Sequence, residues 1–179
     1  LLRFARLPDN KPLGNPPVMH FQKVFIAIGS NLGDRAANCG RAMELIGLLQ
    51  GAELVRKSSL YETEPWGISD QGRFINAAVE VRTSLPPAEL LKALKAIEAA
   101  MGRRDGLRWG PRVIDLDIIF YGDMIVEEKG LAIPHPRLGE RAFVLAPLNE
   151  IAPDFMHPVL KKTVSELLSQ TGTDGVRRF

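Results

Sequence analysis

Two carboxylates, Asp115 and Asp117, are separated by one residue in an otherwise apolar stretch. If residues 113–120 form a strand, both side chains project from one face, about 6.6 Å apart along the strand. Two like charges on such a strand are costly unless positive charge lies between them. A divalent metal or a pair of basic side chains would supply it, and hard oxygen ligands suit Mg²⁺ together with substrate phosphates.

Four arginines lie just upstream of this pair, and guanidinium groups bind phosphate oxygens through paired hydrogen bonds. Carboxylates for a metal beside arginines for phosphates together indicate phosphoryl transfer. The structural alternative is an Arg–Asp ion-pair network on a half-exposed strand. The run Trp-Gly-Pro-Arg directly before the strand favours the functional interpretation. The four residues are Arg103, Arg104, Arg108 and Arg112.

The composition is that of a globular chain with a substantial core. Its 179 residues are 45% hydrophobic and 25% charged, which fits one domain. The net charge of +2 indicates no general nucleic-acid or membrane surface, and no apolar run is as long as a membrane span. Cys39, the only cysteine, suits a small core position and a reducing cytoplasm.

Three segments are expected along the chain. Residues 1–20 carry four prolines and predict a disordered linker or a remnant of an upstream segment. Residues 21–171 show the periodicity of a single folded domain. Residues 172–179 predict a loose tail.

Apolar periodicity and turn residues predict the elements that must position the acids and arginines. Asp34 can cap the first helix, and prolines open the second. In the strand at residues 113–120, one face is expected to hold Ile114, Leu116, Ile118 and Phe120. The order βαββαβ predicts a ferredoxin-like α+β sandwich with additional C-terminal helices. We expect strands at residues 23–28, 54–62, 74–81 and 113–120, and helices at residues 35–49 and 84–101.

The rest of the chain predicts shorter elements. A capping box formed by Thr163 and Glu166 opens the last helix. We expect short strands at residues 124–126 and 131–133, and helices at residues 139–146 and 163–170.

A flat ring could bind where Phe74 and Asn76 share one face of a strand. The aromatic side chain would stack on the ring, and the amide would read its edge. The alternative is a half-buried phenylalanine beside a solvated asparagine. The loop at residues 63–72 holds Trp66 together with two glycines, which is typical of a lid.

His135 lies between two prolines, which hold it in extended backbone. It could donate to a phosphate, and the alternative is a histidine in a surface turn. The turn at residues 29–34 lacks the spacing of a phosphate-binding loop, so we expect a tight turn that can also line a pocket.

Several blocks of the sequence resemble, in the same order, the 6-hydroxymethyl-7,8-dihydropterin pyrophosphokinases of folate biosynthesis. The likeness covers about residues 22–160. The chain departs from the family pattern at Asp105, where the family often has arginine, and at Gly72, where proline is common. The most specific block is Arg108-Trp-Gly-Pro-Arg-Val-Ile-Asp-Leu-Asp-Ile-Ile119, and the others are residues 27–33, 59–67, 74–78, 133–137 and 141–148.

The resemblance implies a ferredoxin-like monomer that binds MgATP, transfers the pyrophosphoryl group to the pterin hydroxymethyl oxygen and releases AMP. It implies two Mg²⁺ ions held by Asp115 and Asp117, which with Arg103 and Arg112 form the catalytic set. Neither nucleic acid nor membrane is an expected partner, whereas fusion to another folate enzyme fits the likeness. By the same likeness, phosphates bind to Arg103, Arg112, His135 and Arg141, the nucleotide also meets Glu98, Trp109, Ile118 and Leu131, and the pterin slot consists of Thr63, Trp66, Phe74, Asn76 and Phe143.

Two other functions remain open from the residues alone. A different Mg²⁺-dependent kinase would form ADP, and a nucleotidyltransferase would release free pyrophosphate. An RNA-binding module of this fold would show aromatic side chains on the sheet where this chain has Asp115 and Asp117. Its RNA affinity would fall steeply with salt and would need no Mg²⁺.

Overall fold

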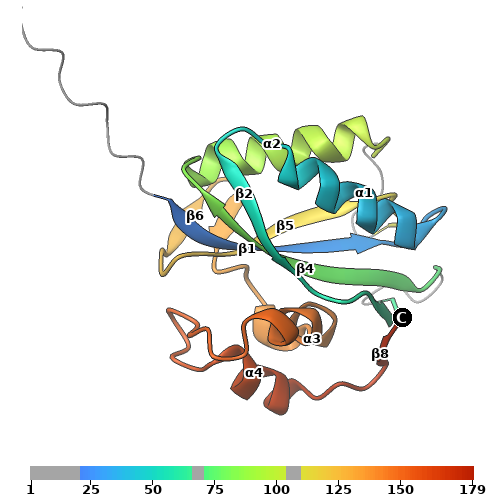
Figure 1. The fold of residues 1–179 in the computed structure, drawn as a ribbon. Coiled ribbons are helices and arrows are strands. Elements are labelled where there is room, and N and C mark those ends of the chain that lie inside the picture. Colours follow the sequence, from blue (N-terminus) through green and yellow to red (C-terminus); the bar gives the residue numbers. More distant parts are fainter. Residues whose placement is uncertain (1–20, 66–70, 104–109) are drawn as a thin grey trace, which may run out of the picture.

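The computed structural model describes residues 21–65, 71–103 and 110–179. The chain is an α+β protein in which helices cover both faces of one antiparallel sheet (Figure 1). Within the described part of the chain, no helix is long and apolar enough to cross a membrane. The elements are β1 Gln22–Ser30, α1 Arg35–Gly47, β2 Ala52–Lys57, β3 Tyr61–Thr63, β4 Phe74–Thr83, α2 Pro87–Ala100, β5 Asp115–Tyr121, β6 Val126–Glu128, β7 Leu131–Ile133, the 3₁₀ turn η1 Leu138–Glu140, α3 Ala142–Ile151, α4 Val164–Thr171 and β8 Val176–Arg178.

The main sheet has the strand order β5-β1-β4-β3-β8, with β2 also paired to β4. Each of its pairings is antiparallel. β1 is an inner strand because its run from Val24 to Ile28 is apolar and can be covered on both faces. Strands β6 and β7 form a separate small hairpin.

Two hydrophobic cores lie on opposite faces of the sheet. Helices α1 and α2 cover the first, and α3 and α4 cover the second (Figure 1). Each large apolar side chain buried there stabilises the fold by about 1.5–3 kcal/mol. The face of β4 expected to be buried is confirmed in the first core, and consists of Ile75, Ala77, Val79 and Val81.

The helix starts agree with the sequence signals. The Asp34 carboxylate accepts a hydrogen bond from the backbone of Ala37 at 3.0 Å, and Pro87 occupies the first turn of α2. Thr163 and Glu166 form the expected capping box at α4. The side chains of Asp34, Thr163 and Glu166 accept from backbone N–H groups that have no partner within their helix.

The strand expected at residues 54–62 is wrong as a single element, because the structure has β2 and β3 there. The break falls at Ser58, whose hydroxyl accepts from the backbone of Ala78 at 2.9 Å and donates to the carbonyl of Ser59 at 2.7 Å. A side chain that bonds to neighbouring backbone in this way competes with the regular ladder.

The face predicted for Phe120 is also wrong. The register between β1 and β5 shifts by one residue between Ile118 and Phe120. Such a bulge places an extra residue, here Ile119, in one strand and reverses the alternation beyond it. Phe120 therefore packs in the second core, with its ring edge-on to Phe25 at 6.3 Å, whereas Ile114, Leu116 and Ile118 lie in the first core.

Two C-terminal predictions need correction. The tail expected to be loose at residues 172–179 contains β8, which pairs with β3. The helix expected to stop at residue 146 runs as α3 to Ile151 and includes Pro147. Burial of Leu148 and Ile151 in the second core supports the helix beyond the proline, which cannot donate its own backbone hydrogen bond.

Candidate active site

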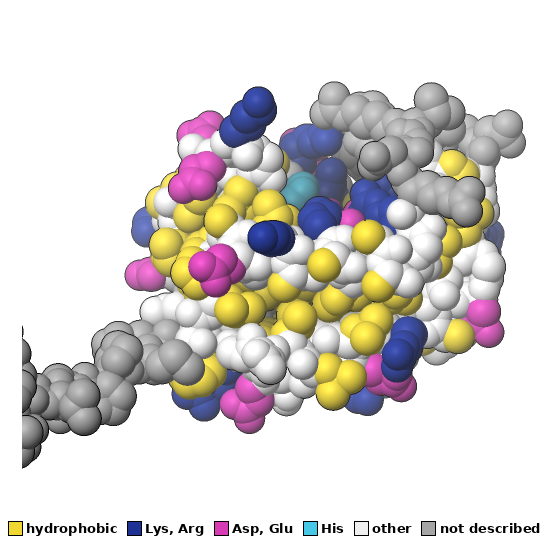
Figure 2. All heavy atoms as spheres, turned by 90° about the horizontal axis from the view of Figure 1, so that it is seen from above, with side chains coloured by type: hydrophobic (Ala, Val, Ile, Leu, Met, Phe, Trp, Pro, Cys, Tyr) yellow, Lys and Arg dark blue, Asp and Glu magenta, His cyan; other side chains and the backbone are white. Residues whose placement is uncertain are grey.

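A pocket opens where the α3 side of the sheet meets the ends of several strands. Figure 2 shows basic side chains and a histidine gathered around a hollow. β1, β3, β4 and β5 and the start of α3 contribute to it because their ends converge at this place. Its lining includes Gly29, Thr63, Glu64, Gln71, Phe74, Asn76, Arg112, Asp115, Asp117, Arg141 and Phe143.

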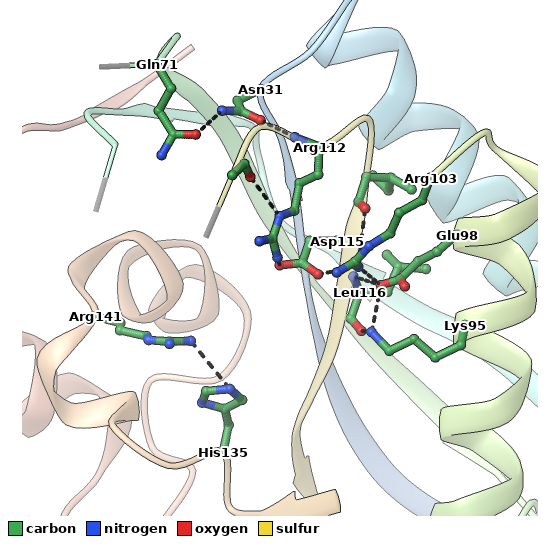
Figure 3. Close-up of polar contacts among 12 residues, drawn as sticks. Asn31, Gln71, Lys95, Glu98, Arg103, Arg112, Asp115, Leu116, His135 and Arg141 are labelled. Carbon is green, nitrogen blue, oxygen red and sulfur yellow. Dashed lines mark hydrogen bonds and ion pairs between the residues drawn. The ribbon is translucent and has the colours of Figure 1, made fainter. Parts of the chain in front are cut away.

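Asp115 lies at the start of β5 between two guanidinium groups (Figure 3). Nη1 of Arg103 lies 2.5 Å from its Oδ1, and Nη1 of Arg112 lies 2.7 Å from its Oδ2. Burial alone would raise the pKa of Asp115, but the positive charges of Arg112 and Arg103 hold it below its usual range. Asp115 is therefore a carboxylate that pairs with two arginines, of which Arg112 lines the pocket.

Asp117 lines the same pocket two residues farther along β5, as the strand period predicted. Its situation differs from that of Asp115, because burial and the negative charge of Asp115 raise its pKa. The ion-pair alternative from the sequence holds for Asp115, which is bridged to two arginines. At Asp117 the net effect of the surroundings disfavours the negative charge, so an added cation would stabilise the charged carboxylate.

Arg141 and His135 contribute nitrogen groups from the segments near α3. Nη1 of Arg141 lies 3.4 Å from Nε2 of His135 (Figure 3). The backbone N–H of His135 donates to the carbonyl of Ile119 at 3.0 Å, which fixes the residue beside β5. Burial lowers the pKa of His135, although the nearby charge of Asp117 opposes this shift.

Glu98 is buried behind the site rather than at its surface. Its Oε1 accepts from the backbone N–H of Leu116 at 2.7 Å and lies 2.6 Å from Nη1 of Arg103. Nζ of Lys95 lies 2.8 Å from the same oxygen (Figure 3). One carboxylate at the end of α2 thus holds both Arg103 and the stretch of β5 between the two aspartates.

The turn after β1 fixes Arg112. Oδ1 of Asn31 accepts from the backbone N–H of Arg112 at 2.8 Å, and the backbone N–H of Asn31 donates to the Arg112 carbonyl at 3.2 Å. Nδ2 of Asn31 donates to Oε1 of Gln71 at 3.0 Å (Figure 3). Asn31 therefore joins three chain segments at the pocket.

The opposite part of the pocket is a slot with aromatic and amide groups. Phe74 and Phe143 both line it, and Nδ2 of the buried Asn76 donates to Oγ1 of Thr63 at 2.7 Å. At Gly29 an added Cβ would lie 3.0 Å from Oδ1 of Asn76, so the absence of a side chain there leaves room for this amide. The slot could accept a flat ring with hydrogen-bonding edges.

Eight of the predicted site residues line this pocket, Arg103 and His135 contact residues of its lining, and Glu98 lies behind Arg103. Trp66 and Trp109 lie outside the described residues. Ile118 and Leu131 belong to the first core, on the other face of the sheet from the pocket. The predicted residues that line the pocket are Thr63, Phe74, Asn76, Arg112, Asp115, Asp117, Arg141 and Phe143.

The sequence did not single out every residue that shapes the pocket. Gly29 and Asn31 lie in the turn that was expected to line a pocket, but no role was assigned to either side chain position. Glu64 and Gln71 line the pocket from the two ends of the stretch expected to be a lid. Polar residues in a loop carry no periodic signal, so only their proximity in space identifies them.

Together the fold and the pocket define an α+β protein whose pocket joins basic side chains to a slot lined by aromatic and amide groups. The profile of the family described as 7,8-dihydro-6-hydroxymethylpterin-pyrophosphokinase (HPPK) matches residues 25–153. The chain therefore belongs to the HPPK family.

Curated relatives and solved structures agree with this membership. The chain is 44% identical over 156 residues to a 2-amino-4-hydroxy-6-hydroxymethyldihydropteridine pyrophosphokinase of Methylorubrum extorquens, covering 87% of this chain and 98% of that protein. It is 52% identical over 130 residues to the mitochondrial folate synthesis bifunctional protein of Pisum sativum, covering 73% of this chain and 25% of that protein. A Plasmodium falciparum HPPK-DHPS structure has a similar fold, with a TM-score of 0.75 at 18% identity, covering 90% of this chain and 49% of that one.

Proposed function

We propose that this chain transfers the pyrophosphoryl group of MgATP to the hydroxymethyl oxygen of 6-hydroxymethyl-7,8-dihydropterin, a step of folate biosynthesis. The pterin hydroxyl oxygen would attack the β-phosphorus as its proton passes to the medium, the bond from that phosphorus to the oxygen that bridges it to the α-phosphorus would break, and AMP would leave with that oxygen. The observation that carries the proposal is that the Asp115–Asp117 pair and the Phe74–Asn76 slot open into one pocket. Family membership and the names of the bacterial relatives support the same reaction.

The aromatic slot is the proposed pterin site. Phe74 and Phe143 would stack on the two fused rings of the pterin, and the Asn76 amide would form hydrogen bonds with its amide-like edge. The Thr63 hydroxyl accepts a hydrogen bond from the Asn76 amide, so it would orient that amide for the ligand. Trp66 remains a predicted contributor to the pterin site.

The arginine-rich side is the proposed triphosphate site. Arg103, Arg112, Arg141 and His135 would bind phosphate oxygens, and this requires Arg103 and Arg112 to share their donors between Asp115 and the ligand. For transfer at phosphorus, positioning and charge neutralisation matter more than a covalent intermediate. Glu98 would act through Arg103, while Ile118, Leu131 and Trp109 remain proposed parts of the nucleotide site.

The residues of the site fit magnesium. Asp115 and Asp117 place hard oxygen ligands at one pocket, and the raised pKa of Asp117 reflects burial together with the like charge of Asp115, which a cation would offset. We propose that both carboxylates hold Mg²⁺, two ions in the presence of ATP. When bound, the metal would neutralise charge on the polyphosphate.

The proposal also includes the finer description of the fold and the setting of the chain. The strand order and the two helices on one face support a ferredoxin-like arrangement, formed by a single domain at residues 21–171 and extended by β8. We propose a monomer that works in the cytoplasm on two small molecules. The proposed partners also include a second folate-synthesis domain, because the pea relative is named bifunctional.

Product analysis tests the function. The full chain would be incubated with ATP, Mg²⁺ and the dihydropterin, and the nucleotide products separated by ion exchange. We expect AMP and a pterin pyrophosphate in equal amounts. ADP would instead indicate a kinase, and free pyrophosphate would indicate a nucleotidyltransferase.

A further inference from the structure

Strand β8 completes the sheet next to the ring slot. It pairs antiparallel with β3, so that Thr63 lies opposite Val176 and Glu62 lies opposite Arg177. β3 has three residues, and β4 flanks its other side. Without β8, β3 would be a very short edge strand, and such edges open more easily than inner strands.

The Glu62 carboxylate connects β8 to the other segments around the slot. It is buried at 8% exposure on the side of β3 opposite to Thr63. Nη1 of Arg35, at the start of α1, lies 3.1 Å from its Oε1, and Nη1 of Arg73, just before β4, lies 3.4 Å from its Oε2. Nε of Arg177 donates to Oε2 at 3.0 Å, and Nη2 of Arg177 donates to the same oxygen.

A second carboxylate connects the neighbouring part of β8 to α3. Glu150 of α3 accepts from the backbone and hydroxyl of Ser59 at 3.0 and 2.9 Å, and from the hydroxyl of Tyr61 at 2.9 Å. Nη2 of Arg178 donates to the Ser59 hydroxyl at 2.5 Å. Tyr61 and Glu62 of β3 are therefore held from outside the pocket.

Thr63 transmits this arrangement to the ligand slot. It follows Glu62 directly, is 4% exposed, and accepts the hydrogen bond from Asn76 at 2.7 Å. A shift of β3 by a fraction of an ångström would weaken that bond and change the orientation of the Asn76 amide.

We propose that β8 and Glu62 hold β3 in the position that the ring slot requires, and that Arg177 of β8 does this through its contact with Glu62. This inference rests on the function proposed above, because it assigns to the slot the binding of the pterin. The matched family region ends at residue 153, so β8 lies beyond it. Arg177 and Glu62 act through Thr63 and Asn76 and do not themselves contact the ligand.

The test is a split between the Michaelis constants of the two substrates. Arg177→Ala in the full chain is expected to raise KM for the pterin about five- to tenfold and to change KM for ATP less than about twofold. Glu62→Gln should act in the same direction and more strongly, because it weakens three arginine contacts at once. Arg177→Lys should restore part of the loss, since one amine replaces two guanidinium donors.

Arg41→Ala is the matched control. It also removes an arginine from an ion pair, with Glu44 at 2.8 Å, but on the exposed surface of α1. It should leave both Michaelis constants unchanged. Hydrogen exchange on the ligand-free chain gives a readout independent of turnover, and amides of β3 should exchange faster in Arg177→Ala than in Arg41→Ala.

Two results would overturn the inference. One is an unchanged pterin KM in Arg177→Ala with unchanged exchange in β3, and the other is an equal rise of both Michaelis constants. If the unsubstituted chain forms no AMP from ATP and the pterin, the proposed function fails instead, and the exchange experiment still tests whether β8 holds β3.

Discussion

The two sides of the pocket hold their groups by different interactions. At Asp115 the side chains are charged and each fixes the next, as Glu98 holds Arg103 and Arg103 holds Asp115. At Asn76 the contacts are neutral, with one hydrogen bond to Thr63 and an amide oxygen close to Gly29. Removing a charge should therefore affect the acidic side most, whereas adding a single carbon should affect the slot most.

The largest effect is expected from loss of either aspartate. Asp115→Ala or Asp117→Ala should lower the rate of AMP formation on the order of 10³-fold or more, because each removes a proposed metal ligand and its charge. Turnover would be measured at saturating ATP and Mg²⁺, with circular dichroism to show that the fold persists. Unchanged turnover in both variants would refute the metal assignment.

Loss of Arg112 should have the next largest effect. Arg112→Ala is expected to lower the rate on the order of 10²-fold, because it removes a donor to the phosphates and one partner of Asp115. Arg112→Lys should recover part of this loss, since a lysine carries the charge without the paired geometry. Full activity of Arg112→Lys would show that the paired geometry is unimportant at this position, whereas a lysine variant no more active than the alanine variant would contradict the expected recovery by charge.

Glu98→Gln separates positioning from direct contact. The amide keeps an acceptor for the backbone of Leu116 but loses the charge that faces Arg103. We expect a loss of about tenfold in kcat/KM for ATP, with little change in KM for the pterin. An effect confined to the pterin would contradict the arrangement in which Glu98 supports the phosphate side.

Gly29→Ala examines the neutral side. The added Cβ would lie 3.0 Å from Oδ1 of Asn76, so the amide must move by a few tenths of an ångström. We expect KM for the pterin to rise about three- to tenfold while KM for ATP stays nearly constant. Calorimetric titration with the pterin measures the same change without turnover.

The smallest expected effect concerns pH. Burial holds the pKa of His135 below its usual value of about 6.5. As pH falls, the unfolded chain therefore binds a proton at this histidine at a higher pH than the folded chain does. The free energy of unfolding should therefore fall as pH decreases through about 6.5. Urea denaturation at several pH values would show this slope, and it should be shallower in His135→Gln.

The comparison between the two sides also shows what could be predicted. Asp115 and Asp117 were placed correctly on one face because strand alternation is a local rule. Phe120 was placed on the wrong face because a bulge depends on pairing with β1, which no periodicity reveals. β8 was missed because three residues carry too little pattern to indicate a strand, and its pairing partner lies more than a hundred residues away.

The sequence alone was enough to identify the two aspartates, the arginines and the aromatic–amide pair as candidate site residues, and to predict where the helices begin. Spacing and residue type decide these features locally. Only the tertiary structure decided that Glu98 lies behind Arg103 rather than at the surface, that Asn31 holds Arg112, and that Glu62 joins β8 to α1. Most of these contacts connect residues that are far apart in the chain. They form only when the packed sheet and helices bring the side chains together.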